Sequence, residues 1–285
     1  MPLPDNSAFL VCRDDLRLYY RDYNPDASGT PVLCLPGLTR NSRDFDQLAD
    51  TLSKDRRVLT TDFRGRGRSD YDPEWQRYHP ETYVDDMIEL LDALGIERVI
   101  VIGTSLGGLC GMSMARRFPD RVLGLVMNDA APELNPVGLA RVVEYAGRTR
   151  PVDDWEDAGR LCRDIYGEWL IGLDDDDFVA LAKRGYREDE RGRPVPDVDP
   201  NVGRAVREVR SQAMDPWADF MSLQDKPVLL LWGTLSDLIT KDIVDKMVEK
   251  RPDLRVQPIP DRGHVPLLDE PDSLAAINTF LEANP

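Results

Sequence analysis

Short apolar runs alternate with amphipathic stretches along most of this chain. Residues 9–12 and 16–20 alternate apolar and polar side chains on either side of 13–15, which predicts an N-terminal hairpin. Beyond it, apolar runs predict strands, and segments with apolar residues at helical spacing predict helices. The predicted strands are 32–35, 58–61, 99–102, 122–127, 228–232 and 254–258, and the predicted helices are 41–54, 81–94, 106–118, 241–249 and 273–281. This alternation predicts an α/β fold with a mostly parallel, eight-stranded sheet and helices on both faces.

The alternation stops in the middle of the chain. Residues 132–217 contain several helical stretches, no predicted strand, and a proline-punctuated loop at 193–196. The strand pattern then resumes. A parallel sheet interrupted by a helical block predicts one core, 1–131 together with 218–285, that carries an inserted helical cap at 132–217.

A candidate nucleophile lies between a fully apolar strand and a helix. The run reads Gly103-Thr104-Ser105-Leu106-Gly107, a GxSxG motif in the strand–turn–helix context that the motif requires. A serine at the tip of so tight a turn needs close neighbours without side chains, and the glycines meet that need. The helix N-terminus also favours developing negative charge. Ser105 is therefore the predicted nucleophile.

A serine nucleophile needs a histidine base and a carboxylate that orients it. His264 lies after the last strand, where functional loops of a parallel sheet gather, and it is the predicted base. His79 precedes a helix, which indicates a turn or helix-entry role. Asp237, shortly after strand 228–232, is the predicted acid because the order Ser…Asp…His fits. Asp129, which follows strand 122–127, is the rival, for which a loop-capping role is expected.

Two backbone N–H groups are predicted to form an oxyanion hole. Leu106 N–H belongs to the turn itself, and Leu38 N–H follows the Pro36-Gly37 bend after strand 32–35. Arg40 could bind a carboxylate or lie on the surface, and both interpretations stay open. The aromatic residues of the cap are expected to form its core more often than a pocket wall. The residues named as candidate pocket lining are Gly37, Thr39, Arg40, Tyr145 and Trp169.

Composition narrows the classes of partner. The net charge of −16 and pI near 4.6 disfavour nucleic acid and membranes, so a small-molecule substrate is expected, for a monomer or homodimer. No apolar stretch reaches bilayer length and the first residues lack a secretory pattern, which predicts a cytoplasmic protein. Four dispersed cysteines predict reduced, buried thiols, and two histidines without a Cys/His cluster predict no metal. The acidic run 174–177 lacks the spacing of a calcium loop and indicates a helix start.

With these motifs in order, the chain resembles the α/β-hydrolase superfamily along nearly all its length apart from the cap. Pro36-Gly37-Leu38 resembles the family's oxyanion loop, and residues 103–108 resemble its nucleophile elbow. The run Asp62-x-Arg64-Gly65-x-Gly67-x-Ser69 resembles the family's D-x-R-G-x-G-x-S loop. Trp232-Gly233-x-x-x-Asp237 and Gly263-His264 resemble the acid and base segments. The overall pattern looks similar to capped serine carboxylesterases and 3-oxoadipate enol-lactonase-like proteins.

This resemblance implies hydrolysis of a carboxylic ester or lactone through an acyl-enzyme on Ser105, with no cofactor. Ser105 departs from the aspartate nucleophile of haloalkane dehalogenases and epoxide hydrolases. A C–C bond hydrolase of meta-cleavage or β-diketone type and a perhydrolase or haloperoxidase-like enzyme remain alternatives with the same triad. A non-catalytic small-molecule receptor is the alternative of another class.

Overall fold

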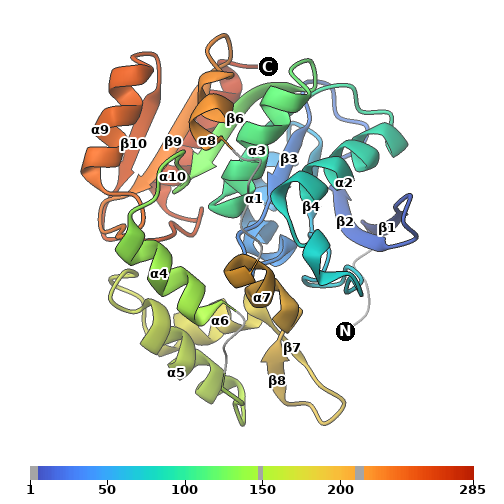
Figure 1. Cartoon of the computed structure of the whole chain (residues 1–285), viewed down its shortest axis with the longest axis vertical. Coiled ribbons are helices and arrows are strands. Elements are labelled where there is room, and N and C mark those ends of the chain that lie inside the picture. The colour runs from blue at the N-terminus through green and yellow to red at the C-terminus, as the bar shows by residue number, and fades with distance from the viewer. Residues whose placement is uncertain (1–5, 147–149, 209–214) are drawn as a thin grey trace.

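The computed structural model describes residues 6–146, 150–208 and 215–285, and these form an eight-stranded sheet covered by helices (Figure 1). The strand order is β1-β2-β4-β3-β5-β6-β9-β10; β1, β2 and β4 pair antiparallel and the remaining pairs are parallel. This confirms the predicted mostly parallel α/β sheet. The strands are β1 Ser7–Val11, β2 Arg17–Tyr23, β3 Val32–Leu35, β4 Val58–Thr61, β5 Val99–Thr104, β6 Val122–Asn128, β9 Val228–Gly233 and β10 Arg255–Ile259.

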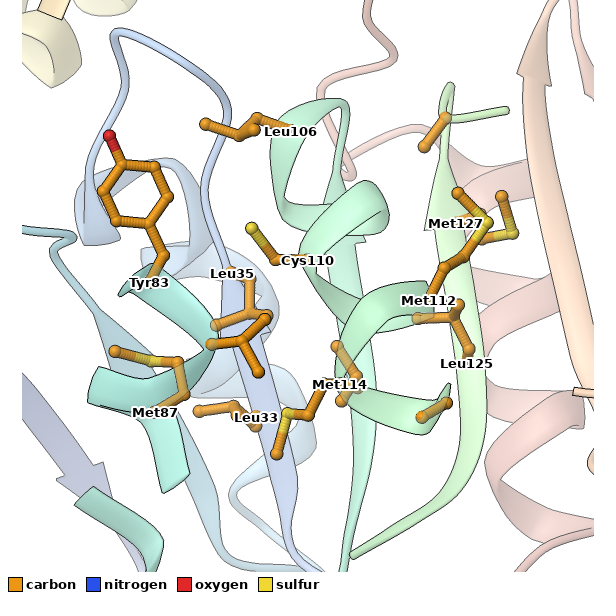
Figure 2. Close-up of a cluster of buried hydrophobic side chains, with 14 of the residues drawn as sticks. Leu33, Leu35, Tyr83, Met87, Leu106, Cys110, Met112, Met114, Leu125 and Met127 are labelled. Atoms are coloured by element: carbon orange, nitrogen blue, oxygen red, sulfur yellow. The ribbon is translucent and has the colours of Figure 1, made fainter. Parts of the chain in front are cut away.

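Helices cover both faces because the central strands are apolar on both sides. In β5, Val99 and Val101 pack into the cluster beneath α2 and α3, whereas Ile100 and Ile102 pack into the cluster beneath α1 and α10. Figure 2 shows the first cluster, in which leucines of β3 pack near side chains of α2 and α3, and side chains of β6 pack on the other side of α3. The core helices are η1 Ser42–Phe45, α1 Asp46–Leu52, η2 Trp75–Arg77, α2 Pro80–Ala93, α3 Leu106–Arg117, α8 Pro216–Met221, α9 Lys241–Lys250 and α10 Pro271–Glu282.

The described residues between β6 and α8 form a cap beyond one end of the sheet (Figure 1). It has its own apolar cluster, which includes Phe178 and Leu181. The expected end of the insertion, residue 217, falls inside α8, but Phe220 of that helix packs in the core cluster with α3. The cap elements are α4 Pro136–Tyr145, α5 Trp155–Tyr166, α6 Asp175–Gly185, β7 Tyr186–Glu188, β8 Pro194–Pro196 and α7 Pro200–Glu208.

The expectation of a cap without strands is wrong. β7 and β8 pair antiparallel, with Tyr186 opposite Pro196 and Glu188 opposite Pro194. Because proline has no N–H to donate, β8 offers few ladder hydrogen bonds, and such a strand survives only in a short hairpin away from a sheet interior. The prolines that suggested a loop are thus compatible with this isolated hairpin.

Other local predictions agree with the structure. Asp174 is the N-cap of α6, and it forms a reciprocal capping box with Asp177: each side chain accepts from the other's backbone N–H at 3.0 Å. The acidic run therefore begins a helix, as predicted. His79 caps α2, its side chain accepting from Glu81 N–H.

The glycine-rich loop 62–69 fastens the cap to the core. Gly67 N–H donates to the Asp197 carbonyl at 2.9 Å, and Asp199 N–H donates to the Gly65 carbonyl at 2.8 Å. Asp62 accepts from the backbone N–H of Ser42 at 2.7 Å, which also ties the loop after β3 to it. The loop thus holds the cap, the β3 loop and the sheet in one arrangement.

Candidate active site

Ser105 lies on a strained turn between β5 and α3. Its φ is +49°, a conformation that non-glycine residues rarely adopt, and strain of this kind marks functional positions. The turn fits only because its neighbours are glycines. A Cβ on Gly103 would lie 2.4 Å from the Gly107 carbonyl carbon, and a Cβ on Gly107 would lie 2.1 Å from the Leu35 carbonyl oxygen. The motif residues are therefore required by packing as well as by the presentation of the serine.

His264 approaches Ser105 from the loop after β10. Its Nε2 lies 2.9 Å from Ser105 Oγ, within hydrogen-bond distance, and the imidazole is 7% exposed. The structure thus brings together the predicted nucleophile and the predicted base, which are separated by 159 positions in the chain.

Asp129 orients the imidazole. Its Oδ2 lies 2.7 Å from His264 Nδ1 and also accepts from Ser236 Oγ at 2.7 Å, while its Oδ1 accepts from Gly233 N–H at 3.1 Å. The carboxylate is completely buried. Its backbone φ of +45° bends the chain immediately after β6, which holds the side chain against the carboxyl edge of the sheet.

Asp237 does not lie against His264, which corrects the predicted acid. Its two carboxylate oxygens accept from Arg141 Nε at 2.7 Å and Nη2 at 2.6 Å. The Arg141 guanidinium in turn stacks 4.1 Å from the Trp169 ring centre. The chain leaves β9 at Gly233, and the loop that follows places Asp237 beside the cap helix α4 instead of beside His264.

Of the two predicted oxyanion donors, Leu106 follows Ser105 directly in the chain and Leu38 lines the same cavity as Ser105. Leu106 is the first residue of α3, where an N–H has no acceptor within its own helix. The Gly37 carbonyl accepts from Arg40 N–H at 3.2 Å. Because the N–H and C=O of a trans peptide point in opposite directions, Leu38 N–H is directed out of that turn. Arg66 Nε donates to the Leu38 carbonyl at 2.9 Å and fixes the next peptide.

Ser105 and His264 open into a cavity between core and cap. Gly37, Thr39, Arg40 and Tyr145 line it, as predicted, whereas Trp169 lies outside this lining and packs on Arg141. Burial raises the pKa of the Tyr145 and Tyr166 hydroxyls, so both phenols are neutral here. Tyr166, one of the cap aromatics, also lines the cavity. The sequence reasoning missed the following lining residues: Asp44, Thr104, Asn128, Val142, Leu170, Leu181, Arg184 and 265–268.

A second cavity lies between the cap and the core, adjacent to the first. Thr39, Arg40, Tyr145 and Tyr166 line both cavities, so they form the wall between the two. The second cavity continues to the β7–β8 hairpin. Its aromatic and aliphatic lining is continuous with that of the Ser105 cavity.

The four cysteines are free and buried, which agrees with the expected reduced thiols. Burial raises the pKa of Cys12 and of Cys110 to about 12. Within residues 6–146, 150–208 and 215–285, no group of three or more His, Cys, Asp and Glu side chains is arranged to hold a metal ion. Among the same residues no helix is both long and apolar enough to cross a membrane.

Comparison with known proteins agrees with this fold. The profile of the α/β-hydrolase fold family matches residues 30–271, so the chain belongs to the α/β-hydrolase family. A crystal structure of an α/β hydrolase from Novosphingobium aromaticivorans superposes with a TM-score of 0.91 at 40% identity, covering 97% of each chain.

Two curated relatives extend over nearly the whole chain. A 3-hydroxybutyrate-oligomer hydrolase from Cupriavidus necator is 29% identical over 93% of this chain and 92% of its own length. A 2-(acetamidomethylene)succinate hydrolase from Mesorhizobium japonicum is 27% identical over 96% of each chain. The family and these relatives support hydrolase activity for this chain.

Proposed function

We propose that this protein is a serine hydrolase that cleaves carboxylic esters or lactones through an acyl-enzyme on Ser105. One observation carries the proposal: Ser105 Oγ, His264 and Asp129 form a continuous chain of contacts of 2.9 Å and 2.7 Å, and Ser105 and His264 line a cavity. These are the distances and roles of a nucleophile, a base and an orienting acid.

The first half-reaction forms the acyl-enzyme. With Nδ1–H donating to Asp129, His264 presents an unprotonated Nε2 to Ser105 and takes its proton as Oγ attacks the carbonyl carbon. The buried Asp129 carboxylate stabilises the imidazolium that results. His264 then gives this proton to the leaving alkoxide, and the alcohol departs.

The second half-reaction releases the acid. A water molecule in the cavity gives a proton to His264 and attacks the acyl carbon. As the tetrahedral intermediate collapses, the bond to Ser105 Oγ breaks, His264 returns the proton to Oγ, and the acid leaves. In both steps the N–H groups of Leu106 and Leu38 receive the negative oxygen. Such donors contribute about 2.7–4 kcal/mol each in the transition state.

One of the two relatives supports ester cleavage. An oligomer of 3-hydroxybutyrate is joined by ester bonds, so the relative from Cupriavidus necator supports this bond type. The same triad could also serve the cleavage of other acyl bonds, and the relative from Mesorhizobium japonicum acts on a substituted succinate.

The direct test is turnover of p-nitrophenyl acetate and butyrate by the wild-type protein and by Ser105→Ala. We expect the wild type to release p-nitrophenol catalytically and Ser105→Ala to lose this release. Absence of both turnover and a burst in the wild type contradicts the proposal, and so does full activity in His264→Ala.

A further inference from the structure

The Ser105 cavity carries more positive than negative side chains although the chain as a whole has a net charge of −16. Arg40 and Arg184 line it, and Asp44 is the single acidic residue in the lining. Cleavage of an ester needs no guanidinium group in the triad mechanism. The two arginines therefore need an explanation beyond the chemistry of Ser105.

Arg40 is held in place with one nitrogen left over. Its Nε and Nη2 donate to Asp44 at 2.8 Å and 2.6 Å, and the side chain is largely buried. Burial opposes the positive charge, but the charge and hydrogen bonds of Asp44 prevail and raise the pKa of Arg40. Nη1 makes no bond to Asp44 and lies near Gly185, which lines the second cavity, whereas Arg40 itself lines both cavities.

Arg184 has a fixed backbone and a loosely held guanidinium. Its carbonyl, at the end of α6, accepts from Asn41 Nδ2 and from Arg43 Nε, both at 2.9 Å, which ties it to the loop after β3. Its Nη2 forms an ion pair with Asp269 Oδ2 at 3.6 Å, a distance longer than a direct hydrogen bond. Arg184 therefore lines the cavity, and its ion pair with Asp269 involves only Nη2 of its guanidinium group.

We propose that the substrate carries a free carboxylate besides the bond that is cleaved, and that Arg184 binds this carboxylate in the Ser105 cavity, with Arg40 on the same wall. A planar guanidinium can donate two parallel N–H···O hydrogen bonds to the two oxygens of a carboxylate. This ion pair is stronger in a cavity that is partly shielded from water. The inference rests on the proposed function, and it restricts the substrate class to acid-bearing esters or lactones.

A matched pair of substrates isolates the carboxylate. 3-Acetoxybutyrate and 3-acetoxybutyramide share the acetyl ester and differ by the charge, and acetate release measures both. We expect the wild type to favour the carboxylate in kcat/KM. In Arg184→Gln the ratio of kcat/KM for carboxylate over amide falls by about tenfold to a hundredfold, the cost of losing a hydrogen-bonded charge.

The neighbouring residue of α6 supplies the control. Lys183 is exposed and lies outside the cavity lining, so Lys183→Gln removes the same charge and keeps the wild-type ratio. Arg40→Lys keeps a charge beside Asp44 but removes the fork, and we expect it to lower the ratio as well.

The outcomes separate this inference from the proposed function. A merely structural role of Arg184 lowers kcat/KM for both substrates equally, and an unchanged ratio in Arg184→Gln overturns the inference. Turnover of p-nitrophenyl acetate without a preference for the carboxylate overturns the inference alone. Failure of the wild type to hydrolyse any of the three esters overturns the proposed function.

Discussion

Exchanging the carboxylate beside His264 for an amide tests the revised acid. In Asp129→Asn the buried shape is kept, but one oxygen becomes an NH₂ group. Oδ2 accepts from both Ser236 Oγ and His264 Nδ1, and Oδ1 accepts from Gly233 N–H. If the NH₂ replaces Oδ2, it donates to Nδ1 and moves the imidazole proton to Nε2. If it replaces Oδ1, the NH₂ group faces the Gly233 N–H, and two donors then face each other without an acceptor.

The first orientation disables the base, because a protonated Nε2 cannot take the proton of Ser105. In the serine proteases the corresponding amide lowers kcat about 10⁴-fold, or roughly 5 kcal/mol in activation free energy, and we expect a loss of this order here. Asp237→Asn is the matched control. It weakens the bidentate, mostly buried ion pair with Arg141 and therefore lowers the folding stability, but kcat stays within about threefold.

The assay is kcat for p-nitrophenyl acetate, with the thermal midpoint of each variant measured in parallel. A folded Asp129→Asn with near wild-type kcat, alongside an Asp237→Asn that has lost activity, would refute the assignment of Asp129 as the orienting acid.

The remaining predictions concern packing and stability. Gly107→Ala forces a Cβ to 2.1 Å from a carbonyl oxygen and should lower the unfolding free energy by more than about 2 kcal/mol in urea titrations, whereas Gly37→Ala, with its nearest contact at 3.6 Å, should lower it little. A large loss in Gly37→Ala instead would contradict the packing argument. The buried thiols should react with Ellman's reagent at pH 8 only after denaturation, and rapid labelling of the native protein would argue against their burial. Asp174→Ala should lower the unfolding free energy by about 1 kcal/mol because the helix loses its N-cap, and Asp176→Ala should lower it much less. Added CaCl₂ should leave the thermal midpoint unchanged, and a calcium-dependent midpoint would show that the acidic run 174–177 binds the ion.

Much of the fold was predictable from local pattern. β4 begins and ends where the apolar run predicts it, and the turn around Ser105 follows from the glycines that its close contacts require. The β7–β8 hairpin was not predictable by pattern, since two prolines in three residues are typical of a loop. A strand of three residues, such as β8, is too short to show the alternation of apolar and polar side chains that predicts strands.

The acid was missed because two adjacent strands end at the same sheet edge. β6 and β9 pair in parallel, with Asn128 opposite Leu231, so the loops after both strands reach the neighbourhood of His264. Chain order admits either aspartate. The choice depends on the length of loop between strand and aspartate: Asp129 follows β6 directly, whereas Asp237 is carried off to Arg141. The course of the loop after β9 is set by tertiary packing, and the spacing of residues along the chain does not predict it.

The measurement that tests the central claim most directly is covalent labelling of the nucleophile. The wild type is treated with a p-nitrophenyl alkylphosphonate, which transfers its phosphonyl group to an activated serine, and the adduct is located by peptide mass spectrometry. The account predicts one stoichiometric adduct on Ser105, no adduct in Ser105→Ala, and labelling slowed by orders of magnitude in His264→Ala. A wild type that stays unlabelled, or carries its adduct on another residue, would contradict the account.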